Sequence, residues 1–129
     1  MAVRIKRAYE AAEPADGYRV LIDRLWPRGV TRQEARLDEW ARELAPSPEL
    51  RRWFGHDPSR FEEFRRRYRG ELADQEEALR ALRRRAREGS LTLVYGARDT
   101  EHNGAVVLAE LLRKGGTPTS RRSAEDAER

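Results

Sequence analysis

The segment LTLVYGARDTEHNGAVVLAELL, residues 91–112, constrains the fold more than any other part of the chain. It begins with a β-rich run that stops at Gly96, and it continues with apolar residues at helical spacing, among them Ala105, Leu108 and Leu112. A strand followed by a turn and an amphipathic helix is the unit that places ligands at the carboxyl end of a sheet strand. The segment therefore predicts an α/β fold.

Two further segments have the pattern of strands. Residues 3–9 alternate apolar and polar side chains, and residues 18–25 contain the apolar run Val20-Leu21-Ile22. The connection between them, residues 10–17, contains Pro14 and Asp16-Gly17, which favour a turn. Because a parallel crossover usually takes a dozen residues or more, this spacing by itself predicts an antiparallel hairpin.

The middle of the chain has well-marked helix starts. Thr31-Arg-Gln-Glu34 is a capping box followed by an apolar pattern that extends to Leu44. Ser47-Pro48 and Asp57-Pro58 each pair a capping side chain with a proline at the first helical position. The pattern after Asp57 predicts a core helix with Phe61, Phe64, Tyr68 and Leu72 on one face and with Trp40 and Trp53 packed nearby. Another helix is predicted from Asp74 to Gly89, and a last one from about Glu101.

Length and composition exclude several classes of protein. The 129 residues are sufficient for one domain, which we assign to residues 1–114, and residues 115–129 have the polar composition of a disordered tail. The chain has no apolar run of the ~20 residues that span a bilayer, and its start lacks the apolar centre of a signal peptide. It has no cysteine, which excludes disulfides and thiol chemistry. We therefore expect a cytoplasmic protein without membrane contact.

Charged side chains follow the second predicted strand directly. The stretch VLIDRLWPRG, residues 20–29, passes from a buried strand into Asp23 and Arg24 and reaches Arg28 just before Gly29. Charges at the end of a core strand are costly unless they are paired or solvated, which favours an ion-pair network or a ligand site. The structural alternative is a single Asp23–Arg24 salt bridge that holds the turn.

A second charged group follows the strand at residues 91–95. Arg98, Asp99, His102 and Asn103 lie at or just inside a helix start, where free N–H groups attract anions. If the two strands are parallel, their carboxyl ends share one edge and the two groups face each other across a cleft. The structural alternative is that Asp99 or the next residue caps the helix and that His102 is a surface residue.

The resulting hypothesis assigns a role to each residue. Asp23, Asp99 and His102 are candidate acid–base groups; Arg24, Arg28, Arg98 and Asn103 are candidate ligands for a phosphate or carboxylate; Trp26 and His56 are secondary candidates. His56 precedes Asp57, whose simpler role is to cap the following helix. Two histidines and scattered carboxylates do not have the spacing of a metal site, and we expect neither a metal nor another cofactor.

Arginine dominates the basic residues and suggests an alternative function. Of 27 basic residues only Lys6 and Lys114 are lysines, and arginines cluster at 65–69 and 83–87. These clusters could bind nucleic acid. Glutamates are interleaved with them, however, which favours a solvated, ion-paired surface, and the bias along the whole chain is typical of a GC-rich genome.

Three long stretches resemble a known family. DGYRVLIDRLWPRG, WARELAPSPELRRWFGHDPSRFEEFRRRYRGEL and LTLVYGARDTEHNGAVVLAELL are similar to the YeaO-like branch of the domain-of-unknown-function-488 family, over residues 3 to 113. The resemblance implies a Rossmann-like α/β domain in bacteria, with no established activity. Some members carry a tetrapyrrole methyltransferase label, but this chain has no methyl-donor motif and is short for that chemistry.

A second branch of that family has an Asp-Val-Arg strand end and a Cys-x-Glu…Cys-His-Arg segment. The matching places here are Asp23 with Arg24, and residues 95–103, where no cysteine remains, so a thiol mechanism could not operate. The resemblance implies that both strand ends build one site, and it favours parallel strands over the hairpin.

We therefore predict a small, Rossmann-like α/β fold with a mostly parallel sheet of three or four strands wrapped by about five helices. The predicted function is binding of an anionic small molecule at the strand ends, and the sequence leaves open whether the protein only binds it or is a small enzyme acting on a phosphate- or carboxylate-bearing substrate. The alternative is a nucleic-acid-binding module. The sequence indicates no oligomeric state.

Overall fold

A four-stranded parallel sheet forms the centre of the computed structural model, which describes residues 2–114. Its strands are β1 (Ala2–Arg7), β2 (Tyr18–Leu21), β3 (Glu39–Trp40) and β4 (Ser90–Tyr95), in the order β1-β4-β2-β3. The predicted tail, 115–129, lies outside the described residues. The small α/β fold with a parallel sheet is thus confirmed.

The last strand, β4, lies between the first two strands. It pairs in parallel with β1 on one side and with β2 on the other, so the antiparallel hairpin predicted from spacing is wrong. The short connection from β1 to β2 can link parallel strands because it is compact. Residues 14–16 form a 3-10 turn, and Gly17 follows with a φ of 67°. A Cβ atom at Gly17 would lie 2.2 Å from the Ser90 carbonyl oxygen, so only glycine allows this close approach.

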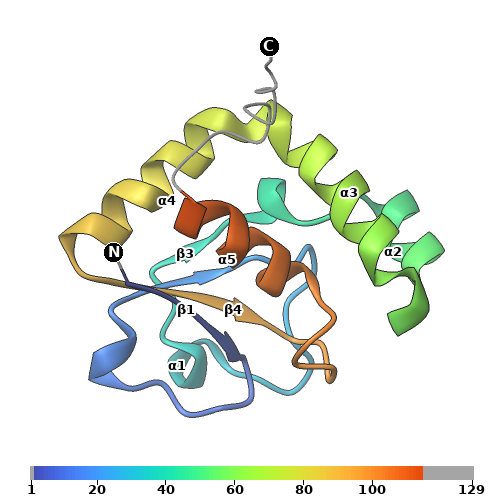
Figure 1. Cartoon of the computed structure of the whole chain (residues 1–129). Helices are drawn as coiled ribbons and strands as arrows, with labels where there is room; N and C mark the ends of the chain where they lie inside the picture. The colour runs from blue at the N-terminus through green and yellow to red at the C-terminus, as the bar shows by residue number, and fades with distance from the viewer. Residues whose placement is uncertain (1, 115–129) are drawn as a thin grey trace.

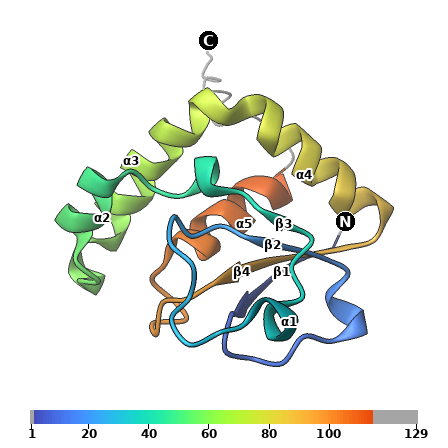
Figure 2. The same ribbon diagram turned by 180° about the vertical axis from the view of Figure 1, so that it is seen from behind.

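Helices cover the two faces of the sheet unequally. Figures 1 and 2 show α3, α4 and α5 on one side and the short α1 on the other. The α-helices of the described part are α1 (Arg32–Ala35), α2 (Pro48–Phe54), α3 (Phe61–Leu72), α4 (Glu76–Glu88) and α5 (Gly104–Lys114). Buried residues of α2 to α5 form one apolar layer with the side chains on the covered face of the sheet.

The helix predicted to run from Thr31 to Leu44 ends early. The capping box of Thr31 and Glu34 forms as predicted, but α1 stops at Ala35, and Arg36 adopts a left-handed conformation with a φ of 46°. The cause is tertiary. The buried side chain of Arg19 donates a hydrogen bond to the carbonyl of Ala35, and the chain then continues as β3 beside β2.

The predicted apolar face of α3 is confirmed. Phe61, Phe64, Tyr68 and Leu72 are all buried, and Trp53 packs against this layer. Trp40 was predicted to pack there too but lies in the second apolar cluster, with Trp26, at a distance of 5.4 Å between ring centroids. Trp40 therefore belongs to β3 and the opposite face of the sheet, because residues 39–40 form a strand and not a helix.

A buried ion-pair network supports the β1–β2 connection. Asp16 is 1% exposed, and its carboxylate lies 2.6 Å from Arg19 and 3.1 Å from Lys6. Its carbonyl accepts a hydrogen bond of 2.7 Å from Thr92 in β4. Burial alone would raise the pKa of Asp16, but hydrogen bonds from the Glu13 amide, Lys6 and Arg19 lower it below its ordinary value.

Replacing Phe64 with alanine should lower the free energy of unfolding by about 3–5 kcal/mol, because the ring is buried between Phe54 and Tyr68. Urea denaturation followed by circular dichroism measures this. Arg66→Ala, on the solvent side of the same helix, is the control and should change the value by less than about 1 kcal/mol. Equal effects of the two substitutions would contradict the assignment of the buried face.

The Asp16 network should make stability depend on pH. Because the pKa of Asp16 is lower in the folded state, its contribution is present above the unfolded pKa of about 3.9 and is lost as pH falls below it. Asp16→Asn should cost about 3 kcal/mol at pH 7, because it leaves the buried Arg19 without its anion and Lys6 with only the exposed Glu13. Thermal unfolding of both proteins should show this difference shrinking toward pH 3; a constant difference would refute the ion-pair explanation.

Candidate functional site

The carboxyl ends of β2 and β4 are joined by a direct hydrogen bond. Asp23 follows β2, and one of its carboxylate oxygens, Oδ2, accepts a hydrogen bond of 2.8 Å from the amide of Gly96, which follows β4. The backbone carbonyl of Asp23 accepts a second one of 2.7 Å from the indole N–H of Trp40. Asp23 is therefore held in place by the parallel pairing of the two strands.

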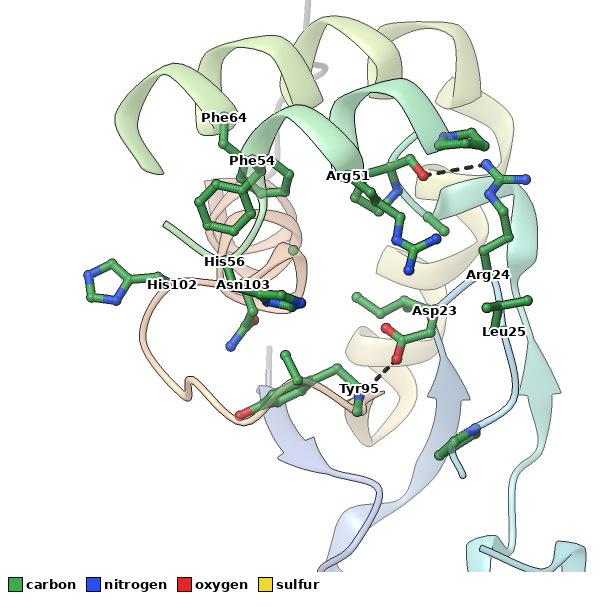
Figure 3. Close-up of a pocket in the computed structure, with 18 of the residues that line it drawn as sticks. Asp23, Arg24, Leu25, Arg51, Phe54, His56, Phe64, Tyr95, His102 and Asn103 are labelled. Carbon is green, nitrogen blue, oxygen red and sulfur yellow. Dashed lines mark hydrogen bonds between the residues drawn. The ribbon is translucent and has the colours of Figure 1, made fainter. Parts of the chain in front are cut away.

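A pocket of about 460 Å³ opens at this edge of the sheet (Figure 3). The two strand ends form its floor, and α2 and the loops on either side of it form the opposite wall. The lining is mixed in character, with apolar and aromatic side chains surrounding a few charged ones. A concave, largely apolar pocket with a few polar groups is the usual form of a small-molecule site.

The structure brings six of the predicted site residues together and leaves three outside the lining. Those that line the pocket are Asp23, Arg24, Trp26, His56, His102 and Asn103. Arg28 and Arg98 are exposed, and neither belongs to the lining; Asp99 also lies outside it. The expected meeting of both strand ends is therefore found, but two of the four predicted ligand-binding side chains lie elsewhere.

The N–H groups before α5 are already occupied by a carboxylate of the protein. One oxygen of Asp99 accepts hydrogen bonds from the amides of Glu101, at 2.9 Å, and His102, at 3.0 Å. The side chain of Asn103 caps the helix itself by accepting from the amide of Val106. The bond from the Glu101 amide, followed by those with the side chain and the amide of His102, lowers the pKa of Asp99. The sequence left open that Asp99 caps this helix; in the structure Asn103 is the cap, and Asp99 binds the amides of the preceding turn instead.

His102 is held by Asp99 on the far side of the pocket from Asp23. Its Nδ1 lies 2.9 Å from the second carboxylate oxygen of Asp99, and its ring meets Phe61 edge-on at 5.1 Å. In Figure 3 the imidazole lies at the rim, away from Asp23. Asp23 and His102 are thus not arranged as an acid–base pair that acts on one atom.

The electrostatics of the pocket centre on Asp23 and on arginines that sequence reasoning missed. Burial raises the pKa of Asp23, while the Gly96 amide and the charge of Arg51 act in the opposite direction. Arg51 and Arg52 come from α2 and line the pocket together with Arg24. No local pattern distinguishes these two arginines from others in the chain, because only the packing of α2 brings them over the sheet edge.

His56 enters the lining through an unusual backbone conformation. Helix α2 ends at Gly55, and both Gly55 and His56 are left-handed, with φ values of 55° and 59°. Such values are uncommon for a residue with a side chain and are found disproportionately at functional sites. The turn brings the imidazole beside Phe54, with 6.4 Å between the ring centroids.

Residues 2–114 have neither a metal-binding cluster nor a membrane-spanning helix. They contain no cluster of three or more histidine, cysteine, aspartate or glutamate residues that could hold a metal ion. Within the same range, none of the helices has the length and apolarity needed to cross a membrane.

Comparison with known proteins identifies relatives over most of the chain. The family model described as "Inactive DUF488-N3 subclade" matches residues 2–128. An uncharacterized protein from Escherichia coli named YeaO is 45% identical over 113 residues, which cover 88% of this chain and 98% of YeaO. Uncharacterized proteins from Mycobacterium bovis and Mycobacterium tuberculosis are each 44% identical over 110 residues, covering 85% of this chain and 92% of each relative. No solved structure matches. The chain belongs to the DUF488 family, as a YeaO-like member.

Proposed function

We propose that the pocket at the strand ends binds a small organic anion that carries a phosphate or carboxylate group. The observation that carries the proposal is the charge of the lining: the three arginines Arg24, Arg51 and Arg52 face a single carboxylate, Asp23. Arginine suits both groups because its planar guanidinium can donate two parallel hydrogen bonds. An anion would therefore offset an excess of positive charge in a partly enclosed space.

The state of Arg24 supports this proposal. Its Nε is buried and has no hydrogen-bond partner within the described part of the chain. Its Nη2 lies 3.5 Å from the carbonyl oxygen of Pro46, at the outer limit of a hydrogen bond. A buried N–H group without a partner costs free energy, and a ligand oxygen would remove that cost.

The side chains that line the pocket fit a protein that binds its ligand better than one that catalyses a reaction. The residues that line it include no serine, threonine, cysteine or lysine that could act as a nucleophile. The acid–base candidates are separated, because His102 is bonded to Asp99 at the rim. The description of the matching family model, "Inactive", agrees with a pocket that binds a ligand without turning it over.

Contacts within the protein explain the arginine-rich helices better than nucleic-acid binding does. On α3, Arg65 pairs with Glu110 at 3.0 Å and Arg67 pairs with Glu63 at 2.8 Å. On α4, Arg80 pairs with Glu76 at 3.1 Å. In the cluster at 83–87, Arg83 is buried and donates a hydrogen bond to the carbonyl of Leu111, and Arg85 lies over the ring of Tyr18. Guanidinium groups that are already neutralised by glutamates are typical of a solvated, ion-paired surface.

Arg51→Gln and Arg24→Gln should each reduce the stabilisation that an anionic ligand confers. A thermal-shift screen of wild type with sulfate, sugar phosphates, nucleotides and simple carboxylates identifies a ligand, and titration then gives its affinity. Loss of one charged hydrogen-bond donor should weaken binding by about tenfold or more. Arg28→Gln is the matched control, because Arg28 is exposed in the same loop as Arg24 but outside the lining.

Two results would refute the anion pocket. One is a wild-type protein whose melting temperature is unchanged by every anion in the screen. The other is an affinity that falls equally in the Arg28 control and in the two pocket variants, since this would place the anion on the general surface charge.

Asp23→Asn should strengthen the binding of sulfate at neutral pH by about tenfold, because it removes the one negative charge of the lining. Sulfate keeps its charge over the pH range used. In wild type the affinity should rise as pH falls through the raised pKa of Asp23, because protonation removes the same charge. The variant lacks this contribution, so the dependence on pH should be weaker in it than in wild type. Sulfate affinity that is identical in both at neutral pH would place the ion away from Asp23.

A further inference from the structure

Two opposite charges face each other in the pocket without forming an ion pair. Figure 3 shows the carboxylate of Asp23 and the guanidinium of Arg51 pointing toward one another from the sheet edge and from α2. The two groups interact electrostatically, but no hydrogen bond or salt bridge joins them. The space between them is part of the pocket.

Each of these groups has unused hydrogen-bonding capacity. Asp23 uses Oδ2 for the amide of Gly96, and its Oδ1 accepts no hydrogen bond from residues 2–114. The guanidinium of Arg51 likewise makes no hydrogen bond or ion pair within that range. The pocket therefore offers one acceptor with a negative charge and one donor group with a positive charge, on facing walls.

The pocket also has an aromatic wall and room for an organic ligand. The stacked rings of Phe54 and Phe64, with 4.4 Å between their centroids, form one wall, and Tyr95 lies on the opposite side in Figure 3. A volume of about 460 Å³ is within the range of pockets that hold organic ligands and is more than an inorganic ion needs. The ligand should accordingly have an apolar body.

We propose that the ligand is an amino acid or a closely related zwitterion with an apolar side chain. Its carboxylate binds Arg51, its ammonium group binds the free oxygen of Asp23, and its side chain packs against Phe54 and Phe64. This inference rests on the proposed anion pocket and specifies its ligand. A simple anion bound at Arg51 would leave Asp23 unpaired and repelled, whereas a zwitterion neutralises both groups at once.

Three related probes separate the two contacts in the wild-type protein. L-phenylalanine has both charged groups, 3-phenylpropionate lacks the ammonium group, and phenethylamine lacks the carboxylate. Isothermal titration calorimetry at pH 7 should give the highest affinity for L-phenylalanine, by about tenfold or more over each of the other two, because each lacks one charged hydrogen bond.

Variants assign each contact to its residue. Asp23→Asn should bind 3-phenylpropionate at least as tightly as wild type does but should lose the preference for L-phenylalanine. Arg51→Gln should weaken both carboxylates by about tenfold and bind phenethylamine at least as tightly as wild type does, because it removes a positive charge that repels the ammonium group. Arg28→Gln should behave as wild type with all three probes. Circular dichroism establishes that each variant is folded, and the wild-type comparison stands even where a variant is not.

The outcomes distinguish this inference from the one on which it rests. If wild type binds 3-phenylpropionate as tightly as L-phenylalanine, or binds a nucleotide more tightly than both, the zwitterion is refuted and the anion pocket stands. If L-phenylalanine remains preferred in Asp23→Asn, the assigned role of Asp23 is refuted. If neither carboxylate nor any other anion binds, both proposals fail.

Discussion

The insertion of β4 between β1 and β2 is the constraint on which the rest of the structure depends. All six residues of β4 pair with β1, and four of them also pair with β2, so the last strand in sequence joins the first two. The insertion requires the close approach of Gly17 to Ser90 and the hydrogen bond from Thr92 to Asp16. The buried charges of Asp16 and Arg19 and the half-buried charge of Lys6 lie at this same crossing.

The pocket follows from this arrangement. Parallel pairing places the ends of β2 and β4 side by side, where Asp23 bonds to the Gly96 amide. The layer of α2, α3 and α5 then covers the apolar face of the sheet and brings Arg51 over its edge. Segments that are distant in sequence thus contribute the acidic Asp23 on the floor and the basic Arg51 and Arg52 on the facing wall. Both proposals on the ligand rest on this distribution of charge.

Patterns that depend on near neighbours predicted the local structure well. The capping box of Thr31 and Glu34, the apolar face of Phe61 to Leu72 and the end of α4 at Gly89 are present, because each rests on residues within one or two helical turns. Predictions that needed distant partners were less successful. The helix expected up to Leu44 is interrupted, since Arg19 binds the carbonyl of Ala35 and β3 pairs with β2.

For the candidate site, the sequence by itself determined that charged groups would follow two buried strands. The family resemblance implied that these strands are parallel, and parallel strands bring those ends together. Only the tertiary structure decided which side chains line the pocket: Arg51 and Arg52 do, whereas Arg28 and Arg98 do not, and the Asp99 carboxylate occupies the amides before α5. The reason is physical. The position of a residue along a strand specifies the edge at which it lies, but the direction of its side chain and its partners depend on how the covering helices pack.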